Sequence, residues 1–112
     1  MKVRWTELAS TQLDEAMAYI ARDRPSVAAS WLEHLLESAD SLSEFPDKAP
    51  LADEGKRDDI RELTVIPYRI IYRRDPDAIY ITMVLHERQE FDGADLAQRR
   101  CVEQRNRADG AR

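Results

Sequence analysis

The chain has 112 residues, of which 43% are hydrophobic and 35% are charged, and its formal net charge is −5. A chain of this length is expected to form one domain that buries roughly two thirds of the surface its unfolded form exposes. The sequence has no basic stretch followed by an apolar run, and no run of about 20 apolar residues, so we expect neither a signal peptide nor a membrane span. A single cysteine, Cys101, excludes an internal disulfide and gives no metal-site spacing, and we expect a cytoplasmic location.

The charges are unevenly distributed along the chain. Residues 1–60 carry 7 basic and 13 acidic side chains, whereas residues 61–112 carry 10 basic and 9 acidic ones. Between Arg61 and Arg74 there are four arginines and one acidic residue. A protein whose main task is to bind phosphates usually has a broad positive field. The distribution therefore argues against a general nucleic-acid binder and leaves room only for a narrow cationic site.

The first half of the chain predicts a short strand and two helices. Residues 2–6 are predicted as a strand, and Thr6 is a plausible N-cap for a helix over residues 7–22. Pro25 suits the first turn of a second helix, because its missing N–H is not needed there. Each helix has one apolar stripe, formed by Ala9, Leu13, Ala16, Met17 and Ile20 in the first and by Val27, Ala28, Trp31, Leu32, Leu35, Ala39 and Leu42 in the second. Such stripes are buried when the helices pack as a hairpin against a flat layer.

The second half predicts three strands, at about residues 61–66, 68–74 and 78–86, after a Pro-rich loop. Side chains alternate along a strand, so the sequence assigns them to two faces. The face toward the helices should hold Tyr68, Ile70, Tyr72, Ile79, Ile81, Met83 and Leu85, with Arg61 reaching the rim. The opposite face should hold Arg69, Ile71, Arg73, Tyr80, Thr82, Val84 and His86. We therefore predict an α+β fold in which an N-terminal helical hairpin packs on a small antiparallel β-sheet.

The order and spacing of several short motifs resemble those of the RelE/ParE superfamily of type II toxin–antitoxin toxins, and the ParE branch most closely. The resemblance covers about Val3 to Arg88. It depends on Trp5 before the first helix, Tyr19-Ile20 at its end, Leu42 and Pro46 after the second, Arg61-Glu62-Leu63, Tyr68-Arg69, Tyr72, and Val84-Leu85-His86. We accordingly expect a single toxin domain over residues 1–90, followed by a charged C-terminal tail over residues 91–112 that is helical or disordered.

The resemblance implies a toxin that a cognate antitoxin keeps inactive, and a ParD-like ribbon-helix-helix protein is the expected antitoxin. RelE-like members of the superfamily are ribosome-dependent endoribonucleases that cut messenger RNA. ParE-like members poison DNA gyrase and are not themselves catalysts. We further expect a segment of the antitoxin to cover apolar surface beside the helices and to cap some of the sheet arginines.

RNA cleavage by a ribose 2′-hydroxyl needs a proton acceptor, a proton donor and cations on the phosphoryl oxygens. In RelE-type enzymes a lysine pair precedes the Tyr-Arg motif, and here its positions correspond to Ile60 and Glu62, so that only Arg69 matches clearly. A second ribonuclease arrangement in the superfamily could be imitated by Glu54, Arg69 and His86, but Glu87 stands where that site has a tyrosine. Catalysis is thus disfavoured, and we expect no catalytic residue, metal or cofactor.

The sequence therefore predicts a ParE-like inhibitor of DNA gyrase that acts by binding. The residues expected to contact its partners are Arg61, Arg69, Arg73, Tyr80, His86 and Arg88. Two alternatives stay open at this point: a metal-independent, ribosome-dependent ribonuclease that uses Arg69, His86 and Glu54, and a superfamily member that has lost toxicity. A purely structural role also stays open for Arg69 and Arg73 on a solvated sheet face, and for His86 as a strand-end histidine.

Overall fold

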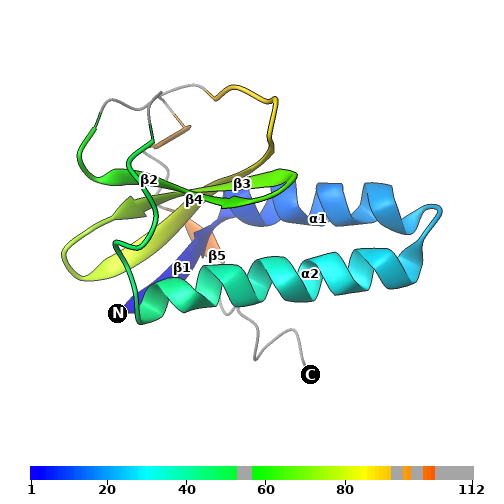
Figure 1. Ribbon diagram of the computed structural model, residues 1–112, viewed down its shortest axis with the longest axis horizontal. Coiled ribbons are helices and arrows are strands. Elements are labelled where there is room, and N and C mark those ends of the chain that lie inside the picture. The colour runs from blue at the N-terminus through cyan, green and yellow to red at the C-terminus, as the bar shows by residue number, and fades with distance from the viewer. Residues whose placement is uncertain (53–56, 92–94, 97–99, 103–112) are drawn as a thin grey trace.

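The computed structural model describes residues 1–52, 57–91, 95–96 and 100–102. Its elements in chain order are β1 (Lys2–Thr6), α1 (Glu7–Ala21), α2 (Pro25–Asp40), the short 3-10 helix η1 (Ser41–Ser43), β2 (Ile60–Val65), β3 (Tyr68–Arg74), β4 (Ala78–His86) and β5 (Cys101–Val102). The two helices form a hairpin that lies along one face of the sheet (Figure 1). This arrangement confirms the predicted α+β class.

The sheet has five strands in the order β2-β3-β4-β1-β5. The β2–β3, β3–β4 and β1–β5 pairs are antiparallel, whereas β1 and β4 are parallel, with Lys2 opposite Ala78 and Trp5 opposite Ile81. The sheet is therefore mixed rather than wholly antiparallel. A parallel neighbour needs a long crossover connection, and the helical hairpin forms part of the connection between β1 and β4.

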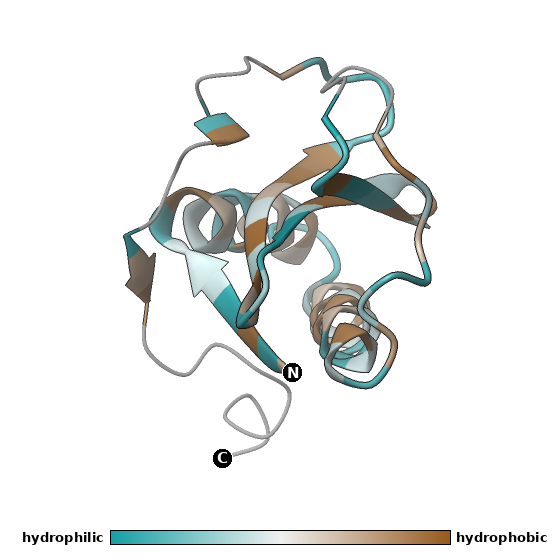
Figure 2. Cartoon of the chain, turned by 90° about the vertical axis from the view of Figure 1, so that its left-hand side faces the viewer, coloured by the Kyte–Doolittle hydropathy of each residue, from teal (hydrophilic) through white to brown (hydrophobic). Residues whose placement is uncertain are grey.

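The main core lies between the helical hairpin and the sheet, where hydrophobic residues occur on both layers (Figure 2). Thr6 joins the layers: its Oγ1 accepts the Ala9 N–H at 3.2 Å as the N-cap of α1, and it lies 3.0 Å from the Ile81 carbonyl oxygen. Helix residues Leu13, Leu35 and Ala39 are fully buried against Ile70, Tyr72, Ile79 and Ile81 of the sheet. Burial of each leucine contributes about 1.5–3 kcal/mol, so this layer supplies much of the stability of the fold.

A β-bulge at Thr82 reverses the faces of the end of β4. Ile71 pairs with Met83 and Tyr72 pairs with Ile81, which leaves Thr82 as the extra residue. The buried Thr82 hydroxyl donates to the Ile71 carbonyl oxygen at 3.0 Å. Beyond the bulge, Val84 joins the core on the helix side, while Met83 and Leu85 join a second apolar cluster. The predicted faces of Met83, Leu85 and Val84 were therefore wrong, as was the grouping of His86 with the sheet arginines.

The second apolar cluster lies on the sheet face opposite the helices and is covered by the chain that follows β4 (Figure 1). Leu96 is only 2% exposed and packs with Ile71, Met83 and Leu85, while Phe91 is partly buried against them. Cys101 and Val102 then pair with Thr6 and Trp5 as β5. The described part of residues 91–112 thus includes a strand rather than a tail that is only helical or disordered. The bulge explains the cover, because it turns two apolar side chains toward this face.

Candidate functional site

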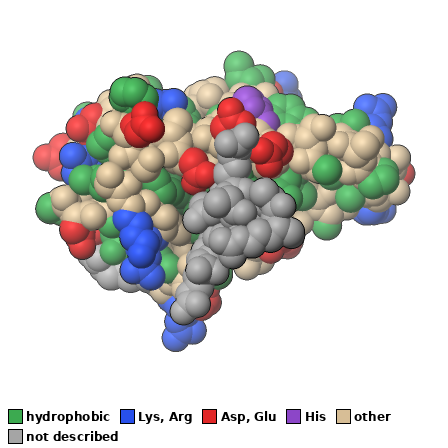
Figure 3. Space-filling model, turned by 90° about the horizontal axis from the view of Figure 1, so that it is seen from below, with side chains coloured by type: hydrophobic (Ala, Val, Ile, Leu, Met, Phe, Trp, Pro, Cys, Tyr) green, Lys and Arg blue, Asp and Glu red, His purple; other side chains and the backbone are tan. Residues whose placement is uncertain are grey.

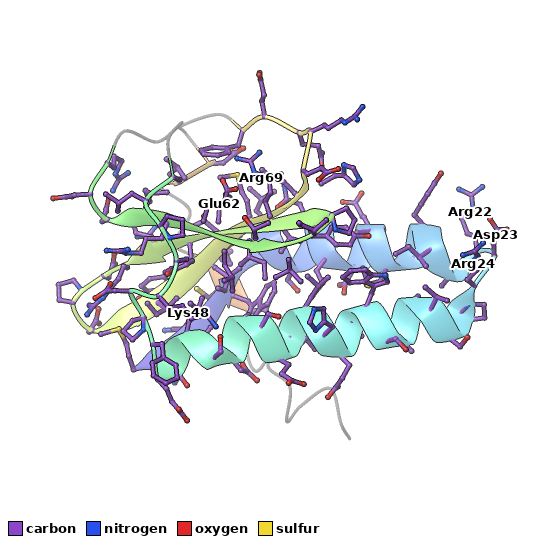
Figure 4. All side chains as sticks on the ribbon, in the orientation of Figure 1. Arg22, Asp23, Arg24, Lys48, Glu62 and Arg69 are labelled. Atoms are coloured by element: carbon purple, nitrogen blue, oxygen red, sulfur yellow. The ribbon has the colours of Figure 1, made fainter. Side chains whose placement is uncertain are left out.

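Arg69 lies on the sheet face away from the helices, and its guanidinium is almost fully enclosed. The residue is 8% exposed; its Nη2 donates to Glu62 Oε1 at 2.8 Å and its Nη1 donates to the Gln89 carbonyl oxygen at 2.6 Å. The labelled side chains of Arg69 and Glu62 lie together on this face (Figure 4). The ring of Phe91 lies 5.8 Å from the guanidinium carbon. The positive charge is therefore neutralised and covered within the chain.

Arg73 is buried still more deeply, at 2% exposure. Its Nε donates to Asp75 Oδ1 at 3.0 Å, its Nη1 donates to the Leu96 carbonyl oxygen at 2.6 Å, and its guanidinium carbon lies 4.7 Å from the centre of the Tyr80 ring. Arg69 and Arg73 thus both bind backbone carbonyls of the segment that follows β4. They fasten that segment to the sheet, and both side chains are buried rather than solvated.

The two remaining candidate arginines lie apart from this pair. Arg61 Nη1 donates to the Ala49 carbonyl oxygen at 2.6 Å, and its Nε lies 3.4 Å from Asp47 Oδ1, so it holds the loop before β2 against the rim, as predicted. Arg88 is exposed beside Arg69. Glu54 lies outside the described residues.

A shallow depression of about 640 Å³ opens beside Arg69. Its lining residues are Pro50, Leu51, Glu62, Thr64, Arg69, Glu87, Arg88, Gln89 and Glu90. Among these the carboxylates outnumber the guanidiniums, and one guanidinium is already paired with Glu62. A phosphate group placed here would meet more negative than positive charge, so the depression is poorly suited to RNA cleavage.

His86 is on the other side of the sheet from Arg69. It follows Val84 to the helix side, where its ring meets the Tyr68 ring edge-on with 6.2 Å between ring centres. Tyr68 in turn meets Trp31 of α2 edge-on at 5.4 Å. The structure therefore separates His86 from the arginines that the sequence grouped with it.

His86 borders a second hollow, here called the α1–β4 groove, with a volume of about 360 Å³. Its lining residues are Gln12, Glu15, Ala16, Tyr19, Tyr68, Val84, Leu85, His86 and Gln89. Tyr19 is 73% exposed at one end, where Arg22 lies over its ring at 5.6 Å. The groove thus combines an aromatic wall from the sheet with one face of α1.

Comparison with known proteins agrees with this geometry. A family model described as "ParE toxin of type II toxin-antitoxin system, parDE" matches residues 3–91. The chain belongs to this ParE toxin family. A Sinorhizobium fredii protein named "Putative toxin Y4kP" is 36% identical over 92 residues, which cover 80% of this chain and 92% of that protein. The solved structure "Chromosomal ParDE TA system from P. aeruginosa" has the same fold, with a TM-score of 0.66 and 19% identity, over 77% of this chain and 95% of that one.

As a ParE-family toxin, the chain is the toxin component of a type II toxin–antitoxin system and has a cognate antitoxin as its partner. Over the described residues, none of its helices has the length and apolar character that a membrane crossing requires. The same part of the chain contains no group of three or more His, Cys, Asp or Glu side chains that could bind a metal ion.

Tyr68, which lines the groove, and Tyr72, which lies in the core, serve packing and hydrogen bonding. Burial raises the pKa of Tyr68, and burial also raises the pKa of Tyr72. Both therefore stay neutral at physiological pH, and the Tyr72 hydroxyl donates to the Pro46 carbonyl oxygen at 2.8 Å. A raised pKa makes Tyr68 a weaker proton donor, which does not favour acid catalysis beside His86.

Sequence reasoning missed two glutamines of the groove in this ParE-family toxin. Gln12 Oε1 accepts the Val84 N–H at 2.8 Å, and Gln89 Oε1 accepts the His86 N–H at 2.7 Å. Neither contact can be read from a local sequence pattern. Each depends on the tertiary fold, which places α1 and the segment after β4 beside the second half of β4. The Glu62–Arg69 pair was indicated more clearly by the sequence, because the strand prediction placed the two residues on consecutive strands.

Proposed function

We propose that this ParE-family toxin acts by binding DNA gyrase and poisoning it, without catalysing a reaction itself. The observation that carries the proposal is the enclosure of Arg69. It is the one clear match to the superfamily's ribonuclease residues, and it is paired with Glu62 and 8% exposed. A cation that must stabilise a phosphoryl transition state has to reach the substrate, and this one is already occupied.

The placement of His86 supports the same proposal. A general acid or base must lie within hydrogen-bond reach of the atoms that it serves, at about 2.6–3.2 Å. His86 faces the helix side with Tyr68, whereas Arg69 faces the opposite side with Phe91. The two residues therefore do not converge on one substrate position, and the ribonuclease alternative loses its proposed pair.

We also propose that the toxin works in the cytoplasm and that its antitoxin is a ribbon-helix-helix protein of the ParD type. A stable toxin–antitoxin contact should bury roughly 1,000 Å² or more in total. The expectation that the antitoxin caps Arg69 and Arg73 has little support, because these residues are 8% and 2% exposed and bind the chain's own carbonyls. The exposed apolar surface beside the helices is the better candidate.

Expression of the toxin without its antitoxin tests the target in cells. Gyrase poisoning should stall cleaved DNA–gyrase complexes, induce the DNA-damage response and produce filaments, while translation continues at first. Co-expression of the antitoxin is the control and should restore growth. Translation that stops within minutes, with messages cut at the ribosomal A site, would contradict the proposal. Normal growth in the presence of soluble, folded toxin would indicate a member that has lost toxicity.

A further inference from the structure

The second half of β4 has an open edge in the middle of the sheet. β1 pairs with β4 only as far as Ile81, because at Thr6 the chain turns into α1. In an antiparallel pair the backbone groups of every second residue point away from the neighbouring strand. Val84 and His86 are such residues, and their N–H groups point toward the α1–β4 groove rather than toward β3.

These two N–H groups are bound by side chains that take the place of a missing strand. The amide oxygens of Gln12 and Gln89 accept them at 2.8 and 2.7 Å. Both glutamines line the groove, Gln12 from α1 and Gln89 from the segment after β4. A backbone carbonyl could replace each amide oxygen at little cost, since one hydrogen bond would be exchanged for another.

The groove also supplies surface for side chains of an added strand. Ala16, Tyr19 and Tyr68 offer apolar contact, and Tyr19 is 73% exposed. Glu15 is the charged residue among the groove's lining residues, and it is acidic and exposed. On the opposite side of the molecule, seen from below in Figure 3, acidic side chains lie among hydrophobic ones and basic side chains lie at the tip of the hairpin. The matching ligand is an extended segment with alternating apolar residues and a lysine or arginine opposite Glu15.

We propose that the β4 edge at Val84 and His86, together with the α1–β4 groove, binds an extended segment of the antitoxin. The segment displaces the Gln12 and Gln89 amides and pairs with β4 as an additional strand. Main-chain hydrogen bonds to β4 supply affinity, and the fit of alternate side chains into the groove supplies specificity. This inference rests on the antitoxin-binding part of the proposed function and is independent of gyrase as the target.

One pair of variants tests the groove. Ala16→Arg fills it, whereas Ala18→Arg places the same charge on an exposed position of the same helix that does not line it. With the antitoxin that is encoded beside this toxin, Ala16→Arg should weaken binding by at least about 30-fold, as expected for a central interface position, and Ala18→Arg should not. Tyr19→Ala should also weaken binding, while Phe45→Ala, which removes another exposed aromatic ring, should not.

Thermal unfolding of each variant shows whether it is folded, and gyrase inhibition by the free toxin separates the two functions. Weaker antitoxin binding with unchanged gyrase inhibition supports the proposal. Unchanged antitoxin binding overturns it. If gyrase inhibition is lost instead, the groove belongs to the target interface. If the toxin self-associates and Ala16→Arg abolishes that self-association instead, the groove binds a second copy of the chain.

Hydrogen exchange tests whether the antitoxin segment pairs with β4, and it does not rely on the Ala16→Arg variant. In Gln12→Ala the Val84 N–H loses its partner, so it should exchange rapidly in the free toxin and at least about 10-fold more slowly in the complex with the antitoxin. The Leu85 N–H, which points toward β3, serves as the internal control and should change little. A Val84 N–H that stays rapid in the complex would overturn strand addition at this edge.

Discussion

Arg69 and Glu62 form an ion pair with 2.8 Å between Nη2 and Oε1, on neighbouring strands of the sheet. Their side chains are 10% and 22% exposed, so water screens the pair only partly. Glu62 stands where a ribonuclease of the superfamily would have a lysine, and here its carboxylate binds the one arginine that the two arrangements share. The residue at position 62 therefore stabilises the fold through Arg69 instead of binding phosphate.

Removal of Glu62 should therefore reduce stability. Glu62→Ala removes the hydrogen-bonded ion pair between Glu62 and Arg69 and should lower the free energy of unfolding by about 1–3 kcal/mol, as expected for a hydrogen bond to a charged group. Urea unfolding measures the loss. Glu90→Ala, an exposed position in the same depression, is the matched control and should change the free energy by no more than about 0.5 kcal/mol. Equal effects at both positions would contradict a structural role for the pair.

Arg73 should be required for attachment of the segment after β4. Arg73→Ala removes the contacts to Asp75, Leu96 and Tyr80 and should cost about 3–5 kcal/mol, because it breaks an ion pair whose arginine side chain is only 3% exposed. Arg73→Lys should recover only part of this, since an ammonium group cannot make the forked and stacked contacts together. Limited proteolysis should cut Arg73→Ala after β4 much faster than Arg88→Ala. Equal cutting of the two would show that Arg73 does not fasten this segment.

His86 should be dispensable for toxicity. A catalytic histidine contributes about 10²–10⁴-fold to a rate, so a conservative replacement would abolish growth inhibition by an enzyme. His86→Gln should still inhibit growth if its level and fold are normal, because His86 acts in packing against Tyr68. Loss of toxicity in the folded variant, together with ribosome-dependent message cleavage by the parent, would point to the ribonuclease.

Stability should fall at alkaline pH in a way that depends on Tyr72. Burial raises the pKa of this phenol above its ordinary value of 10.0. Above about pH 10 the unfolded chain therefore releases the proton more readily than the folded one, and the free energy of unfolding decreases as pH rises. The contribution is fully present below pH 10 and is lost as pH passes through the raised value. Tyr72→Phe should be less stable at pH 7 but should lose stability less steeply between pH 9 and 11.

Much of the fold could be predicted from the sequence because helical stripes, Thr6, Pro25 and alternating strands are local signals. The faces of β4 could not, since the bulge at Thr82 inserts one residue and no glycine or proline marks it. The segment after β4 was missed for a related reason. Leu96 and Val102 form no periodic pattern: Leu96 packs on the apolar face that the bulge creates, whereas Val102 pairs with Trp5 and packs against the main core.

The candidate site was predicted less well than the fold. Residue types and strand positions correctly indicated that Arg61 reaches the rim, but they could not show that Arg73 is buried under Leu96. A charged residue on a strand is usually solvated, and the exception depends on contacts from distant parts of the chain.

The central claim, that this toxin acts on gyrase by binding, is tested most directly with purified components. The toxin is added to DNA gyrase and plasmid DNA, with the toxin–antitoxin complex as the control. We expect inhibited supercoiling or linearised plasmid with the free toxin, full activity with the complex, and the same inhibition by His86→Gln as by the parent. Supercoiling that is unaffected by a toxin that still stops growth and cleaves messages on the ribosome would contradict the account.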